Sequence, residues 1–66
     1  MAVAKVIEIT AASSTSFEDA IAQGISKAGE TVRNIKGAWV KEQQVTVADG
    51  KVSEYRVDLK VTFVLD

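Results

Sequence analysis

The sequence predicts a small α+β fold in the order β-α-β-β, with a three-stranded antiparallel sheet curled around one helix. Three observations predict it. A β-branched run occupies residues 3–10, an apolar stripe with helical spacing follows from residue 17, and apolar and polar residues alternate along residues 52–65. The chain has 66 residues, so we expect a single domain over residues 1–66.

Residues 3–10 predict the first strand, and the polar segment 11–16 predicts the connection to a helix. We expect the helix to begin at Phe17, because Ser16 is a good N-cap and Asp19 occupies the capping-box position. Glu18 adds negative charge to the first turn, where the helix dipole favours it. Apolar residues then recur three and four apart, which predicts one buried helix face that ends near Gly37. The stripe comprises Phe17, Ala20, Ile21, Ile25, Ala28, Val32 and Ile35.

Small residues lie four apart along one line of this helix, at Ala20, Gly24 and Ala28. Glycine in a helix interior costs about 0.5 to 1 kcal/mol relative to alanine, and close approach of another backbone would offset that cost. Two interpretations stay open. Either the helix is closely packed at Gly24, or Gly24 and Gly29 are merely tolerated.

Residues 38–47 and 52–65 predict two strands of a hairpin, with Asp49 and Gly50 as the turn pair that readily takes positive φ. The longer strand would span about 45 Å at about 3.3 Å per residue, whereas a compact chain of this size is about 28 Å across. We therefore expect this strand to curl around the helix or to project into neighbouring subunits. We also expect it to be the central strand, antiparallel to both others.

A two-residue turn at Asp49 and Gly50 fixes the pairing of the hairpin. The expected pairs are Ala48–Lys51, Val40–Leu59, Ala38–Val61, Trp39–Lys60, Lys41–Asp58 and Gln43–Arg56. The apolar pairs would lie against the helix, and the pair formed by Trp39 would lie on the opposite, polar face. Arg56, on that face, is either a solvated strand residue or a guanidinium that stacks on a flat heterocycle.

Trp39 is the only tryptophan, and the register places it among polar side chains. A covered tryptophan buries on the order of 150 to 250 Å², so an uncovered one forgoes a large stabilisation. Two kinds of cover stay open: a neighbouring subunit and a planar ligand.

Composition narrows the functional classes. A chain this short buries only about 60% of its unfolded surface, and the absence of Cys and His removes disulfides and transition-metal sites as supports, so we expect a homo-oligomer.

The net charge of -1 argues against nucleic acid, and no apolar run approaches a membrane span. The start of the chain has no secretory pattern, so we expect a cytoplasmic protein. Catalysis is not expected, because Ser13, Ser14 and Ser16 have no base to activate them.

Four segments of the chain resemble the dodecin family: KVIEIT, SFEDAI, NIKGAWVKEQ and EYRVDLKVTFVLD. The resemblance spans nearly the whole chain and implies a subunit of a hollow homododecamer that binds riboflavin or flavin mononucleotide (FMN). It implies flavin storage, buffering and photoprotection without turnover. Trp39 matches the family's aromatic residue that stacks on the isoalloxazine ring, with paired flavins held between symmetry-related tryptophans.

The chain departs from the family at Arg56, where well-known members carry a Gln that bonds the polar edge of the flavin. Arg offers donors only and cannot reproduce the donor and acceptor of an amide. Gln43 and Gln44 are candidates for the missing amide, although Gln44 lies on the wrong face of an unbulged strand. The alternative function is a structural or scaffold oligomer of the same fold, in which a neighbour covers Trp39 and no flavin binds.

Overall fold

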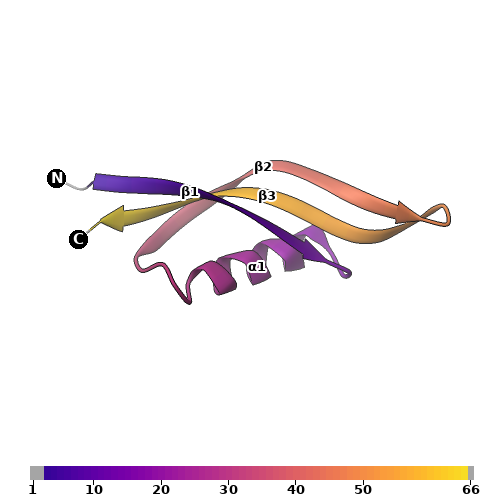
Figure 1. Ribbon diagram of the computed structural model, residues 1–66, viewed down its shortest axis with the longest axis horizontal. Coiled ribbons are helices and arrows are strands. Elements are labelled where there is room, and N and C mark those ends of the chain that lie inside the picture. Colours follow the sequence, from indigo (N-terminus) through magenta and orange to yellow (C-terminus); the bar gives the residue numbers. More distant parts are fainter. Residues whose placement is uncertain (1–2, 66) are drawn as a thin grey trace.

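The computed structural model describes residues 3–65 and contains four elements (Figure 1). They are β1 (Val3–Ser13), α1 (Phe17–Ala28), β2 (Ile35–Ala48) and β3 (Lys51–Leu65). The strands form one sheet in the order β1-β3-β2, and β3 pairs antiparallel with both neighbours. The predicted α+β fold and the central position of the last strand are confirmed.

The molecule is elongated, with principal extents of 51 × 19 × 14 Å. Its radius of gyration is 13.5 Å, whereas a compact chain of this length would have about 11 Å. The hairpin of β2 and β3 accounts for the elongation, because it runs past the ends of both β1 and α1, while the start of β1 and the end of β3 lie at the opposite end (Figure 1). As predicted from its length, β3 extends beyond the compact part of the molecule.

The buried core consists of Ala20 from α1 and of Val57, Leu59 and Val61 from β3. Helix α1 packs on the face formed by β1 and β3, and it leaves β2 to one side. Val40 pairs with Leu59 as predicted, yet 39% of its surface is exposed. The expectation that the helix covers this pair is therefore right for Leu59 and wrong for Val40.

The start of α1 is fixed by hydroxyl groups. Ser16 is the N-cap, and its Oγ accepts a hydrogen bond from the backbone N–H of Asp19 at 3.0 Å. Ser13 is buried, and its Oγ donates to the Asp19 carboxylate at 2.6 Å and accepts from the Thr15 N–H at 2.9 Å. The ring of Phe17 meets the ring of Tyr55 edge to face at 5.1 Å, which fastens the first turn to β3.

The end of α1 differs from the prediction. The helix stops at Ala28 rather than near Gly37, and Gly29 caps it through an N–H bond to the Ile25 carbonyl. Asn34 then takes a φ of 64°, which redirects the chain, and its carbonyl already accepts from Val64 of β3. The helical spacing of the sequence continues beyond this point, but from Ile35 onward the chain pairs with β3 as strand β2. Helix α1 has 12 residues, and the described part of the chain has no helix long and apolar enough to cross a membrane.

Gly24 permits a close approach between helix and sheet. A Cβ at this position would lie 3.1 Å from the Ala11 Cβ and 3.3 Å from the Leu59 Cδ1, which is tighter than ordinary contact. Close packing, the first of the two interpretations, therefore holds for Gly24, while Gly29 serves as the helix cap.

We expect Gly24→Val to destabilise the fold by about 2 kcal/mol, because the added atoms overfill a closely packed contact. Ala22→Val places the same side chain at an exposed position of α1 and should cost only about 0.5 kcal/mol through helix propensity. Urea unfolding of both variants, with native mass measured alongside, checks the difference. Equal losses in the two variants would contradict the close contact at Gly24.

Candidate functional site

The candidate site lies on the face of the sheet that points away from α1, which we call the open face. Trp39 pairs with Lys60 across β2 and β3, as predicted, and so shares the open face with it. The tryptophan is 53% exposed. The described residues thus leave a large aromatic surface uncovered in the middle of a polar strand.

The pairing beyond Val40 corrects the prediction. Lys41 is an extra residue in β2, so Glu42 lies opposite Asp58, where Lys41 was expected. The shift continues along the strand: Gln44 pairs with Arg56, and Gln43 pairs with Val57 on the helix side. Gln44 therefore joins Trp39 and Arg56 on the open face, whereas Gln43 does not.

A second irregularity, between Thr46 and Val47, restores the original pairing of Ala48 with Lys51 at the turn. Asp49 and Gly50 have φ values of 52° and 74°, so the predicted turn pair is confirmed. The two shifts also place Val45, Val47 and Val52 on the helix-side face of the hairpin. Val40 and Val45 are five positions apart, an odd spacing that the extra residue at Lys41 accommodates, so that both valines lie on the same face.

Trp39 and the Gln44–Arg56 pair do not touch the same point of the open face. Trp39 lies opposite Lys60 of β3, and Gln44 lies opposite Arg56 of the same strand. Lys60 and Arg56 are four residues apart, which corresponds to about 13 Å along the strand. Arg56 also lies 3.8 Å from Glu54, with both side chains partly exposed. A ligand that contacts both ends of this stretch must be longer than a single ring.

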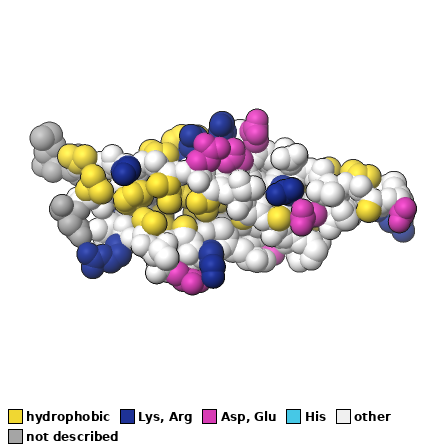
Figure 2. Space-filling model, viewed as in Figure 1, with side chains coloured by type: hydrophobic (Ala, Val, Ile, Leu, Met, Phe, Trp, Pro, Cys, Tyr) yellow, Lys and Arg dark blue, Asp and Glu magenta, His cyan; other side chains and the backbone are white. Residues whose placement is uncertain are grey.

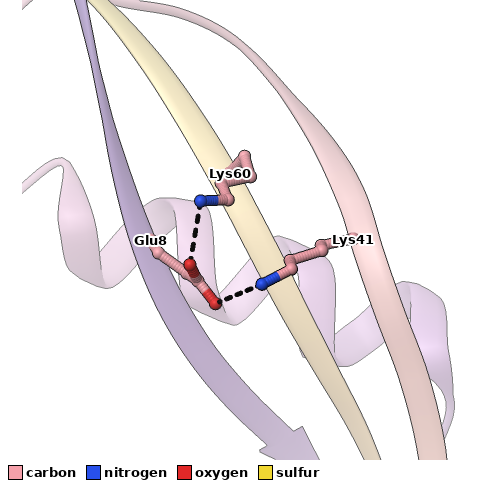
Figure 3. Close-up of polar contacts among 3 residues, drawn as sticks. All are labelled: Glu8, Lys41 and Lys60. Carbon is pink, nitrogen blue, oxygen red and sulfur yellow. Dashed lines mark hydrogen bonds and ion pairs between the residues drawn. The ribbon is translucent and has the colours of Figure 1, made fainter.

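A charged cluster of Glu8, Lys41 and Lys60 lies at the Trp39 end of this stretch, since Lys60 is the partner of Trp39 (Figure 3). Glu8 lies on β1 directly opposite Lys60. One Glu8 oxygen accepts from Lys60 Nζ at 2.9 Å, and the other lies 3.5 Å from Lys41 Nζ. Figure 3 shows the three side chains in front of the sheet with α1 behind it. Sequence reasoning missed this cluster, because Glu8 meets the lysines only once three strands are paired.

Asp58 adds a second carboxyl group to the cluster. The hydrogen bond from Lys60 holds the pKa of Glu8 down at about 2, with a hydrogen bond to Asp58 and the charge of Lys41 acting in the same direction. The pKa of Asp58 is raised, first by its hydrogen bond to Glu8 and then by desolvation and the charge of Glu8. Asp58 is therefore the carboxyl group of this pair that keeps a proton more readily.

Metal ligands are sparse in the described part of the chain: residues 3–65 contain no group of three or more His, Cys, Asp or Glu side chains that could hold an ion.

A cavity of about 960 Å³ lies on the other side of the molecule, between β1 and α1. Its lining combines small apolar residues with polar and charged ones, among them Gln23, Lys27 and Glu30, but within the described residues it includes no aromatic side chain. The open face carries the better candidate site.

We expect Asp58→Asn to raise the melting temperature at pH 7 and to lose this advantage as the pH falls below about 4. The raised pKa of Asp58 means that its contribution to stability is fully present at low pH and is lost as the pH rises through the pKa in the folded protein. An amide removes that loss. Thermal unfolding from pH 3 to pH 7 checks this, and a melting temperature below that of the wild type at pH 7 would contradict it.

Comparison with known proteins places these features in a family. The family model described as Dodecin matches residues 3–66. A Mycobacterium tuberculosis protein named calcium dodecin is 40% identical over 63 residues, which cover 96% of this chain and 89% of that protein. Its crystal structure, described as that of a calcium-chelating immunodominant antigen with a novel calcium-binding site, has a TM-score of 0.83 over 97% of this chain and 91% of that one.

Other solved dodecins are similar along their whole length. An arginine-to-alanine variant of the Thermus thermophilus dodecin is 33% identical, with a TM-score of 0.94 over 100% of this chain and 98% of that one. The dodecin from Streptomyces davaonensis is 31% identical, with a TM-score of 0.94 over 98% of this chain and 96% of that one. The matched segment, the strand order and the near-complete mutual coverage agree: the chain belongs to the dodecin family.

Proposed function

We propose that this protein is a flavin-binding storage protein, assembled as a homododecamer, in which the isoalloxazine ring of riboflavin or FMN stacks on Trp39. One observation carries the proposal: the indole is 53% exposed on the open face, where neither the core nor the helix covers it. Stacked aromatic rings at centroid separations of about 4.5 to 7 Å gain stability beyond simple burial. A flat heterocycle is the ligand class that uses this surface best.

Gln44 and Arg56 extend the proposed site along the open face. The Gln44 amide offers both a donor and an acceptor, and the bulge at Lys41 places it opposite Arg56. Because this pair lies about 13 Å along the strand from the partner of Trp39, it would contact a different part of the ligand from the ring stacked on the same subunit's Trp39. Gln43, on the helix-side face, has no part in this site.

The shape of the subunit supports assembly into an oligomer. Almost all of β2 is exposed, and Val45, Val47 and Val52 of the hairpin are between 41% and 60% exposed. Hydrophobic side chains are visible near the hairpin end and toward the opposite end, and a group of charged side chains lies at the upper edge in the middle of the view (Figure 2). Neighbouring subunits would bury these surfaces, and a two-fold axis would bring a second Trp39 to the other face of the ligand. Membership in the dodecin family supports twelve subunits.

Storage requires no turnover, and the residue inventory agrees with that. The chain contains no His and no Cys, the residues most used for general acid–base and nucleophilic catalysis near neutral pH. A flavin pressed against tryptophan loses its excited state by electron transfer, so stacking on Trp39 would both hold the flavin and protect the cell from it.

Calcium is a second candidate ligand, because a relative with 40% identity is named for it. Calcium takes six to eight oxygen ligands. The described residues of one subunit contain no group of three or more acidic side chains that could hold an ion. A calcium site in this protein would therefore combine oxygen atoms from several subunits.

Titration of riboflavin and FMN into flavin-free protein should quench the flavin fluorescence and saturate near one flavin per subunit. Trp39→Ala should raise the dissociation constant about tenfold or more, since stacking and burial are both lost. Val40→Ala changes the neighbouring residue on the helix-side face and should leave binding unchanged. Native mass spectra of each variant confirm that the oligomer is intact.

Absence of quenching by either flavin in an intact oligomer would contradict flavin storage. The same samples, titrated with calcium in place of flavin, would then separate a calcium-binding oligomer from a scaffold that binds neither ligand and covers Trp39 with a neighbouring subunit.

A further inference from the structure

Glu8 holds the two lysines that lie nearest to Trp39 along the paired strands. Lys60 is the cross-strand partner of Trp39, and Lys41 is the bulged residue two positions after it. Both ammonium groups are drawn toward β1, because the two oxygens of the Glu8 carboxylate lie 2.9 Å from Lys60 Nζ and 3.5 Å from Lys41 Nζ (Figure 3).

Without the Glu8 charge, these ammonium groups have another favourable position. A lysine beside an exposed indole gains from a cation–π contact with the ring face. Trp39 is half-exposed and has Lys60 directly opposite. An ammonium group over the indole would occupy the surface on which a planar ligand stacks.

The charges in this part of the open face also bear on the ligand. Glu8, Glu42 and Asp58 supply three carboxyl groups, against two ammonium groups from Lys41 and Lys60. Because Glu8 already engages both cations, an incoming phosphate meets occupied lysines and neighbouring carboxylates. A phosphate ester carries about −1.5 to −2 charges at neutral pH and is disfavoured there.

We propose that Glu8 is a positioning residue of the Trp39 site: by holding Lys41 and Lys60 against β1 it keeps the indole free, and so selects an uncharged flavin, riboflavin, over its phosphate ester. This selectivity rests on the flavin-binding function proposed above. The positioning of the lysines by Glu8 does not, so the two can be tested separately.

Glu8→Gln tests the proposal in the assembled protein. The released lysines should weaken riboflavin binding about threefold and strengthen FMN binding, so that the ratio of the two dissociation constants shifts about fivefold or more toward FMN. Both effects should shrink as salt is added, because the side chains of Glu8, Lys41 and Lys60 are 31% to 48% exposed.

Glu42→Gln is the matched control, since it removes one negative charge from the same face. It should strengthen FMN binding but leave riboflavin binding unchanged. Adding Lys60→Met to Glu8→Gln should restore riboflavin affinity, because the ammonium group that competes for the indole is gone. Equal effects of Glu8→Gln and Glu42→Gln on riboflavin, or no recovery with Lys60→Met, would overturn the positioning role.

Collisional quenching of Trp39 fluorescence tests the same role without flavin. Glu8→Gln should raise the ratio of iodide quenching to caesium quenching above that of the wild type, and by more than Glu42→Gln does, because the lysines move onto the indole. If no flavin binds but this shift appears, the proposed function fails and the positioning by Glu8 stands. If flavin binds and the shift is absent, the positioning role fails alone.

Discussion

The mismatch in length between β3 and α1 is the constraint on which the rest of this structure depends. β3 has 15 residues and α1 has 12, which correspond to about 50 Å of strand against about 18 Å of helix. One helix can cover only the middle of such a sheet. The core is accordingly confined to Ala20 and three residues of β3, and the remaining sheet surface is left for other partners.

Both uncovered regions follow from this mismatch. The hairpin end presents exposed valines on the side that α1 would cover if it were longer, which is a surface for neighbouring subunits. Within residues 3–65 no element covers the open face, which carries Trp39 with a row of charges beside it. If the assembly buries the first region and leaves the second available, the proposed oligomerisation and the proposed binding of a planar ligand both follow from this geometry.

Much of this could be predicted from sequence, because strong local signals agreed with the tertiary packing. The capping residues before Phe17 fixed the helix start, and Asp49 and Gly50 fixed the hairpin turn. The alternation along residues 52–65 identified the buried face of the central strand. These signals also placed Trp39 opposite Lys60, on the face away from the helix.

Some parts of the fold and of the site could not be predicted. In these parts the local sequence pattern was weak, or the structure depends on the pairing of strands that are distant in the sequence. Residues 41–44 are all polar, so they carry no alternation that specifies a register, and the bulge at Lys41 moved Gln44 rather than Gln43 onto the open face. The helical spacing of apolar residues continues past Ala28 in the sequence, but Ile35 pairs with Phe63 of β3 and belongs to a strand. The role of Glu8 depends on three strands and has no local signature.

A crystal structure of the protein grown with riboflavin tests the central claim most directly, because it shows at once what covers the hairpin and what covers Trp39. We expect the hairpin valines to be buried against other subunits and the isoalloxazine ring to lie parallel to the indole of Trp39 on the open face. A structure in which a neighbouring subunit covers Trp39, with riboflavin absent or bound elsewhere, would contradict this account.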